Sequence, residues 1–198
     1  MNMRVSAPLR RLLGGFLPGS GGSVAVEAAI LLPVLLILMN ATYEVSHFAL
    51  AVNKVDRSAQ TLAQLLARAP ALGSLEVGNS IPLIAAGAVA QPFDINARGR
   101  TIVSVVVDRA DDGNVGPVVL WQKTAGRAQK TSKVGGPGGA ARLPAGLVAP
   151  GGSLVVVEVV YDYRPVIWSE VLANMGAGDV EVYRVAYYMP RIAAFPNS

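Results

Sequence analysis

A single carboxylate stands near the start of a long apolar run, and it is the residue with the most demanding chemistry in the chain. Glu27 is followed only by apolar residues as far as Met39. An ionisable group in a membrane span costs about 2.5–3.5 kcal/mol on insertion scales, so such a group is typical of a functional site. We therefore predict that Glu27 pairs with another group. The alternative is a carboxylate that is merely solvated at the headgroup level.

Other polar residues offer weaker chemistry. Glu44 and His47 are spaced so that they can touch on a helix, but one imidazole and one carboxylate are too few ligands for a metal site. Asp108, Asp111 and Asp112 lie near a turn without the alternating oxygen ligands and closing Glu of a calcium loop. The sequence also has no phosphate loop and no Gly-x-Ser-x-Gly motif. We predict no catalytic residue, no metal and no cofactor, and therefore a protein that is not an enzyme.

The composition excludes further classes of chemistry. The 198 residues include no Cys, which rules out disulfides, thiolate metal sites and Cys nucleophiles. Three of the 17 basic residues precede Gly22, which leaves 14 against 13 acidic residues in the remainder. One local basic stretch has no aromatic residue after Trp121, so we predict a solvated loop and no nucleic-acid site. Its members are Lys123, Arg127, Lys130, Lys133 and Arg142.

The apolar run has the features of a membrane anchor. Residues 23–43 are long enough to cross a bilayer as a helix. Basic residues on one flank keep that flank in the cytoplasm, which predicts a cytoplasmic N-terminus and a C-terminal domain on the other side of the membrane. The basic residues before the run are Arg4, Arg10 and Arg11.

An ordinary secretory signal peptide explains the run less well. The small-x-small sequence of residues 49–51 lies ten residues beyond Met39, and Glu44 and His47 stand between them. Normal cleavage follows soon after an apolar core of 7–15 residues. The Gly-rich residues 16–23, which come before the run, are better placed to bind a protease in an extended form.

Residues 22–33 carry a family resemblance. They read Gly-x-x-Ala-Val-Glu-Ala-Ala-x-x-x-Pro, which resembles the signature of TadE-like minor pseudopilins (TadE or TadF type) of tight-adherence (Flp/Tad) type IV pili. Counting from Ser23, Glu27 is the fifth residue, as in type IV prepilins. Near the C-terminus, residues 161–165 (Tyr-x-Tyr-x-Pro) and residues 190–191 (Pro-Arg) are similar to elements of the same family.

The resemblance implies a mechanism of maturation and assembly. A prepilin peptidase would cleave between Gly22 and Ser23, and the new ammonium of a neighbouring subunit would neutralise Glu27. Such a pair also fixes the axial register between helices. The resemblance further implies a sister pseudopilin, the major pilin and an inner-membrane assembly platform as partners, with the membrane lipid around the helix. It makes Pro33 a point of flexibility in the helix, and the alternative is that Pro33 only bends it.

Beyond the apolar run, the pattern becomes amphipathic. Steps of three and four place a packing stripe on one side of a helix. We predict one helix from about Ser23 to about Ala69, with a kink at Pro33 where the ring removes an amide hydrogen. The stripe consists of Val45, Phe48, Val52, Val55, Ala59, Leu62 and Leu66.

The rest of the chain changes to a period of two. Strands are predicted over residues 101–108, 118–123, 153–163 and 180–189, with a turn at residues 111–114 between the first two. A Gly- and Pro-rich loop is expected at residues 135–152, and a short helix at residues 165–175. Residues 74–97 stay ambiguous, although residues 83–90 are apolar enough for a short helix.

Together these elements predict an α+β fold in which a long N-terminal helix packs on a small antiparallel sheet, as in pilins. The predicted parts are a leader (1–22), a transmembrane helix (23–43), its amphipathic continuation (44–70) and a periplasmic domain (71–198). We predict a minor pseudopilin that supports pilus biogenesis and cell adhesion. The alternatives are an uncleaved single-pass membrane protein with a partner- or ligand-binding domain, and an exported enzyme with an unfamiliar site.

Overall fold

The computed structural model describes residues 21–67, 87–108, 116–176 and 178–190. A helix of 47 residues, α2 (Gly21–Ala67), contains Pro33 in its interior. The chain divides into two compact units, Met1–Tyr43 and Glu44–Ser198, so the two halves of α2 belong to different units. The expected single helix is therefore present, and residues 68–69 of that expectation lie outside the described part of the chain.

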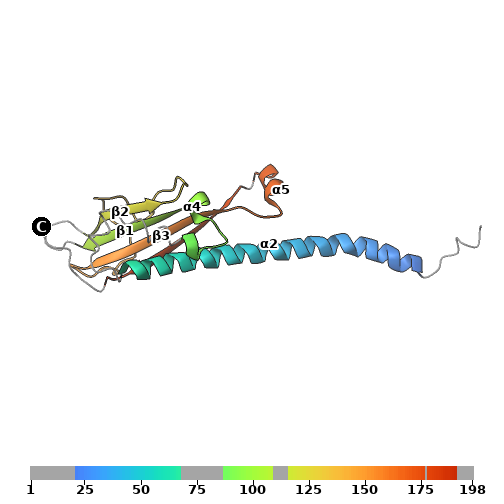
Figure 1. The fold of residues 1–198 in the computed structure, drawn as a ribbon, viewed down its shortest axis with the longest axis horizontal. Coiled ribbons are helices and arrows are strands. Elements are labelled where there is room, and N and C mark those ends of the chain that lie inside the picture. The colour runs from blue at the N-terminus through green and yellow to red at the C-terminus, as the bar shows by residue number, and fades with distance from the viewer. Residues whose placement is uncertain (1–20, 68–86, 109–115, 177, 191–198) are drawn as a thin grey trace, which may run out of the picture. The chain divides into compact units, whose positions relative to one another are not determined.

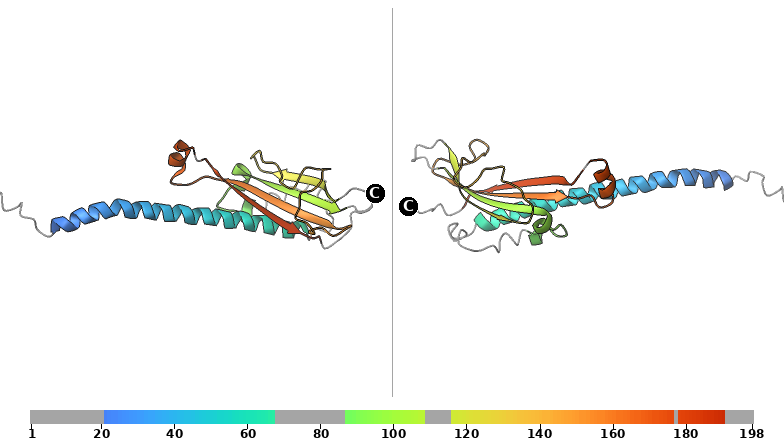
Figure 2. Two further views of the ribbon diagram at one scale, coloured as in Figure 1. Left: turned by 180° about the vertical axis from the view of Figure 1, so that it is seen from behind. Right: turned by 90° about the horizontal axis from the view of Figure 1, so that it is seen from above.

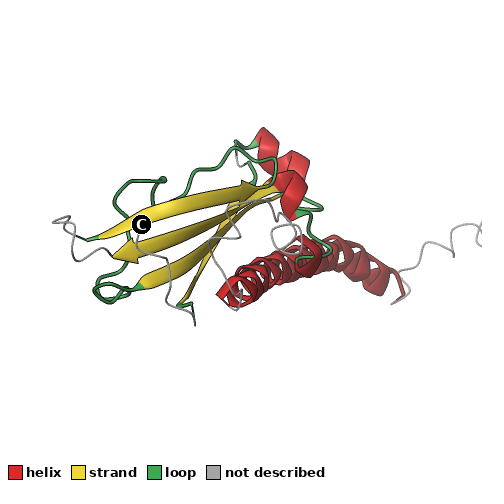
Figure 3. Ribbon diagram, turned by 60° about the vertical axis from the view of Figure 1, so that its left-hand side comes forward, coloured by secondary structure: helices red, strands yellow, loops and turns green. Residues whose placement is uncertain are grey.

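The second unit contains a four-stranded antiparallel sheet in the order β2-β1-β3-β4. Its strands are β1 (Gly99–Asp108), β2 (Pro117–Ala125), β3 (Ser153–Tyr163) and β4 (Val180–Tyr188). Figure 1 labels β1, β2 and β3, and Figure 3 shows the sheet beside the helix. Each predicted strand is present, and β3 has the predicted bounds. The predicted turn at residues 111–114 lies outside the described residues.

The sheet buries residues on both of its faces at the centre. Strands β1 and β3 are rich in Val and nearly continuous in their burial, because apolar clusters cover both faces of the sheet at its centre. Their register pairs Val103 with Val157 and Val105 with Val155. A strand covered on both faces reads as a continuous apolar run and not as an alternating one. The two central strands therefore need cover from both sides.

The second half of α2 supplies the cover on one face. Small residues of the helix, Ala51, Ala59 and Ala63, are fully buried and let the helix approach the sheet closely. Larger side chains, Val55 and Leu62, fill the space between them and the inner face of the sheet. Figure 2 shows this part of α2 along the sheet from behind and from above. This layer forms the main core.

The opposite face is covered by the connection between β2 and β3. Val134 is buried there against Val106, Val119 and Val156, and a bridge joins Val118 to Ala140. The predicted loop at residues 135–152 thus has a packing role, because without it the outer apolar side chains of β1 and β3 would face water.

Two short helices flank the sheet. Helix α4 (Ile95–Arg98) is capped by Asp94, whose carboxylate accepts a hydrogen bond from the amide of Ala97 at 3.0 Å. Helix α5 (Ser169–Asn174) follows Trp168 within the predicted helical segment. Residues 87–89 are helical, while residues 83–86 of the predicted short helix lie outside the described residues.

Candidate functional site

The apolar half of α2 is covered by no other described part of the chain. Its large side chains are exposed from Val24 to Met39. An 18-residue window of the helix has a mean hydropathy of 2.3, so the helix is long and apolar enough to cross a membrane. Asn40 and Thr42 donate to the backbone carbonyls of Leu36 and Leu38, each at 2.8 Å. Because these donors bond to carbonyls of their own helix, they remain compatible with a lipid environment.

Glu27 lies one helical turn after Ser23. The Ser23 hydroxyl donates to Glu27 Oε1 at 3.3 Å, and both residues are exposed. This single long contact leaves most of the acceptor capacity of the carboxylate available, since an ionised carboxylate has about four lone-pair sites. The geometry shows that a donor on residue 23 is within reach of Glu27.

The expected cleavage point lies at the start of α2. Gly22 and Ser23 belong to its first helical turn, and nothing lies within 4 Å of the place where a Gly22 side chain would begin. Gly disfavours a helix by about 1 kcal/mol relative to Ala, so this turn opens at little cost. A protease that binds an extended strand would have to unwind it. Pro33 lies inside the same continuous helix.

The predicted packing stripe spans a gradient of burial. Val55, Ala59, Leu62 and Leu66 are buried in the main core, and Phe48 and Val52 pack against it in part. Val45, at the start of the stripe, is 68% exposed. The helix therefore packs closely on the sheet only from about its second turn beyond Tyr43.

Glu44, the first residue of the sheet-packed unit, receives four hydrogen bonds. The Tyr163 hydroxyl donates to Glu44 Oε1 at 2.7 Å, and the amides of Val166 and Ile167 donate at 3.0–3.1 Å. Burial raises the pKa of the Glu44 carboxyl, but these hydrogen bonds and the nearby His47 outweigh burial and leave the pKa lowered. Glu44 thus fastens the segment after β3 to the helix.

His47 joins the same group of residues. Its Nδ1 lies 3.0 Å from the Tyr163 hydroxyl, and its ring meets the Phe93 ring edge-on with centroids 5.1 Å apart. The predicted neighbours Glu44 and His47 are thus linked through Tyr163, a partner that is remote in sequence. Among the described residues, no group of three or more His, Cys, Asp or Glu side chains is placed to hold a metal ion.

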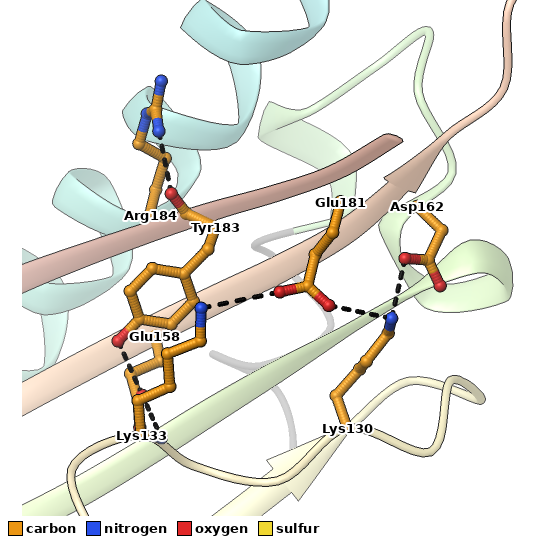
Figure 4. A network of polar contacts seen from close by, with 7 residues as sticks. All are labelled: Lys130, Lys133, Glu158, Asp162, Glu181, Tyr183 and Arg184. Atoms are coloured by element: carbon orange, nitrogen blue, oxygen red, sulfur yellow. Dashed lines mark hydrogen bonds and ion pairs between the residues drawn. The ribbon is translucent and has the colours of Figure 1, made fainter. Parts of the chain in front are cut away.

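A second carboxylate network lies on the outer face of the sheet, and Figure 4 shows part of it. Glu158 of β3 is 0% exposed. It accepts hydrogen bonds from the Ser132 hydroxyl, the Lys133 amide at 2.8 Å and the Tyr183 hydroxyl at 2.7 Å. Burial and the bond to Glu158 raise the pKa of the Tyr183 hydroxyl far above its usual range. These bonds join β3, β4 and the covering loop.

Two Lys residues of the basic stretch continue this network (Figure 4). Lys130 Nζ lies 2.8 Å from Asp162 and 3.0 Å from Glu181, while Lys133 Nζ lies 3.5 Å from Glu181 and 4.0 Å from the Tyr183 ring centroid. Part of the basic stretch is therefore paired within the chain.

A cleft of about 570 Å³ opens beside this network, with Arg100, Lys130 and Arg142 among its lining residues. The Arg100 guanidinium donates to the Thr124 hydroxyl at 3.0 Å and to the Ala128 carbonyl at 3.3 Å. Arg100 and Lys130 are thus both engaged by the chain itself.

Sequence reasoning missed the tertiary partners of both carboxylates. The alternation along β3 puts Glu158 on the face opposite Val157 and Val159, where the covering loop buries it. The one available signal was a lone acid in the middle of the most apolar strand, because such a residue needs nearby donors.

The fold and the exposed apolar helix define a pilin-like α+β protein whose N-terminal helix is suited to membrane anchoring. Residues 22–64 match the family model of TadE-like proteins. The chain therefore carries a TadE-like domain that begins at Gly22 and includes Glu27 and Pro33. The matched residues all lie within α2, and a TadE-like domain suggests a protein that is associated with tight-adherence pili. No curated protein and no solved structure matches the chain.

Proposed function

We propose that the protein is a minor pseudopilin that supports the assembly of tight-adherence pili after a prepilin peptidase removes residues 1–22. The observation that carries this proposal is Glu27, a lone carboxylate on an exposed apolar helix, one turn from Ser23 and within the TadE-like match. A carboxylate in that setting needs a cation, and cleavage would create one nearby.

Processing would hydrolyse the Gly22–Ser23 peptide bond. The water oxygen would remain on Gly22 as a carboxylate, and Ser23 would gain an ammonium group. In the described chain a side-chain donor of residue 23 already reaches Glu27 at 3.3 Å. In an assembly, the ammonium of a neighbouring subunit would take that place and set the stagger between adjacent helices.

The proposed topology follows from the chemistry of the flanks. Arg4, Arg10 and Arg11 hold the leader in the cytoplasm, residues 23–43 cross the inner membrane, and the sheet domain lies in the periplasm. The helix would leave the bilayer for the filament or its base together with a sister pseudopilin, the major pilin and the assembly platform. Pro33 would act there as a point of bending.

The mature N-terminus tests the processing step. Mass spectrometry of protein extracted from membranes of the native host should show a chain that begins at Ser23. A strain without its prepilin peptidase is the control and should yield the longer chain. An intact N-terminus in piliated cells would contradict the proposal and favour an uncleaved single-pass membrane protein.

The role of Glu27 is tested separately by substitution. Glu27→Gln keeps the shape of the side chain but removes the charge, so insertion and processing should persist while pilus number falls severely. Asp56→Asn is the matched control, because Asp56 lies on the same helix beyond the span and accepts a hydrogen bond from Gln60, one turn away, at 2.8 Å. Normal pili with Glu27→Gln would refute the pairing.

A further inference from the structure

The segment after β3 exposes an unusual amount of apolar surface. Helix α5 has no buried residue, although it is flanked and lined by large apolar side chains. Val166 is 51% exposed, Val171 47% and Met175 76%. A helix of six residues is too short to be stable in water by itself, and most helical stability in proteins comes from packing of an apolar face. Nothing in the described part of the chain provides that packing.

The structure also determines where this segment is attached. The amides of Val166 and Ile167 both donate to the Glu44 carboxylate at 3.0–3.1 Å. Glu44 follows directly after Tyr43, where the apolar span ends. The hydrogen bonds therefore hold the exposed apolar side chains beside the point of the helix that adjoins the membrane-spanning segment.

We propose that residues 165–175 form a second membrane contact, with α5 lying in the headgroup region of the bilayer leaflet next to Glu44. Val166, Ile167, Val171 and Met175 enter the upper acyl region, and Trp168 lies at the interface, where aromatic residues are enriched. Glu170, the exposed acid of α5, remains in the headgroup layer. This inference rests on the proposed anchoring of α2.

Lipid fits this surface better than a soluble partner does because of its attachment point. The hydrogen bonds from Val166 and Ile167 fasten it to Glu44, the residue that directly follows the proposed span, where acyl chains are available without any further partner. Two contacts, one spanning and one interfacial, would restrict how the sheet domain tilts on the membrane. The α5 contact would have to be released when the subunit leaves the bilayer.

The chain contains no Cys, so single spin labels can be placed without removing native thiols. The full chain is reconstituted in phospholipid nanodiscs with one label at Met175→Cys, Leu35→Cys or Gln129→Cys. Leu35, in the span, is the lipid reference, and the exposed Gln129, on the connection between β2 and β3, is the water reference. Accessibility to oxygen, which partitions into lipid, is compared with accessibility to a water-soluble nickel complex.

We expect the oxygen-to-nickel ratio of the Met175 label to exceed that of the Gln129 label several-fold and to approach the value at Leu35. Val171→Cys should give the same result and covers the case in which the first variant folds poorly. Equal ratios at Met175 and Gln129, with lipid accessibility at Leu35, would overturn the α5 contact alone. Protection from both reagents would overturn it in favour of a protein partner. Water-like values at Leu35 would overturn the anchoring of α2 as well.

Discussion

The two halves of α2 share one secondary structure and differ in what covers them. Between residues 22 and 43, large apolar side chains such as Leu35 and Met39 are more than half exposed. Between residues 44 and 67, Val55 and Leu62 are at most 1% exposed beneath the sheet. An apolar helix surface must be removed from water in both cases. The second half achieves this within its own chain, whereas the first half requires lipid or another subunit.

The acids of the two regions differ in the same way. Glu158 has three hydrogen-bond donors from its own chain and no exposed surface, so the chain itself stabilises the buried carboxylate. Within the described part of the chain, Glu27 has one hydrogen bond, of 3.3 Å, from the Ser23 hydroxyl one turn away. Buried polar groups are normally paired, and a carboxylate that is left incomplete on an apolar helix indicates a partner outside the chain. The contrast separates residues that hold the fold from Glu27, for which we propose a role in assembly.

The largest effect on stability should come from shortening a buried side chain in the covered half of α2. Leu62→Ala should lower the unfolding free energy of the sheet domain by about 3 kcal/mol, because it removes buried contacts and leaves a cavity. Leu35→Ala should change it by less than about 0.5 kcal/mol, as exposed substitutions usually do. Urea unfolding of the full chain in detergent, followed by the fluorescence of the buried Trp121, measures both. Similar losses in the two variants would abolish the distinction between the halves.

A somewhat smaller effect should distinguish the two acids. Glu158→Gln leaves donors of Ser132, Lys133 and Tyr183 facing an amide that cannot accept from all of them, which should cost about 2 kcal/mol. Glu27→Gln should leave the stability of the sheet domain unchanged. Thermal unfolding followed by circular dichroism compares them. A stable Glu158→Gln variant would show that the outer network contributes little to the fold.

The hydrogen bonds between α2 and Tyr163 of β3 should contribute less to stability than those of Glu158. Tyr163→Phe removes the hydroxyl shared by Glu44 and His47, and should destabilise the sheet domain by about 1 kcal/mol, the usual net value of one hydrogen bond. Tyr188→Phe is the matched control, because Tyr188 is 41% exposed. Equal unfolding midpoints for the two variants in urea would mean that the amides of Val166 and Ile167 are enough to hold Glu44 in place.

The smallest effect concerns the exposed ion pairs and depends on pH. The hydrogen bond from Lys130 lowers the pKa of the Glu181 carboxyl, although burial opposes it. Because the folded-state pKa is depressed, this contribution is complete above the ordinary Glu value of about 4.3 and is lost as pH falls through the lowered pKa. Lys130→Gln should therefore make the unfolding free energy less dependent on pH in the acid range. An ion pair this exposed contributes at most about 1 kcal/mol to the unfolding free energy. If Lys130→Gln and the unchanged chain have the same stability profile at low salt, the pair contributes nothing.

Much of this architecture could be predicted from local patterns. The heptad spacing around Val55 and Leu62 predicted the covered helix face, and the alternation along residues 153–163 predicted β3 with its bounds. Both patterns are local, since a helix repeats every 3.6 residues and a strand every two. The TadE-like signature was likewise readable because it is contiguous in residues 22–33.

The partners of the polar groups could not be predicted in this way. Val166 and Ile167 donate to Glu44 from more than a hundred residues away, and Ser132 reaches Glu158 from a loop without periodicity. Such contacts depend on strand order and on the path of a connection, and neither leaves a local sequence signal. The covering role of the β2–β3 connection was missed for the same reason.

The sequence by itself determined that an apolar helix with one carboxylate would precede a small sheet, because hydrophobic periodicity and burial cost act on each segment separately. Only the tertiary structure decided which acids the chain satisfies internally. It gave Glu44 and Glu158 their donors from remote segments and left Glu27 with the hydroxyl of its own helix. The physical reason is that a buried charge requires donors in three dimensions, and their positions are set by how layers pack.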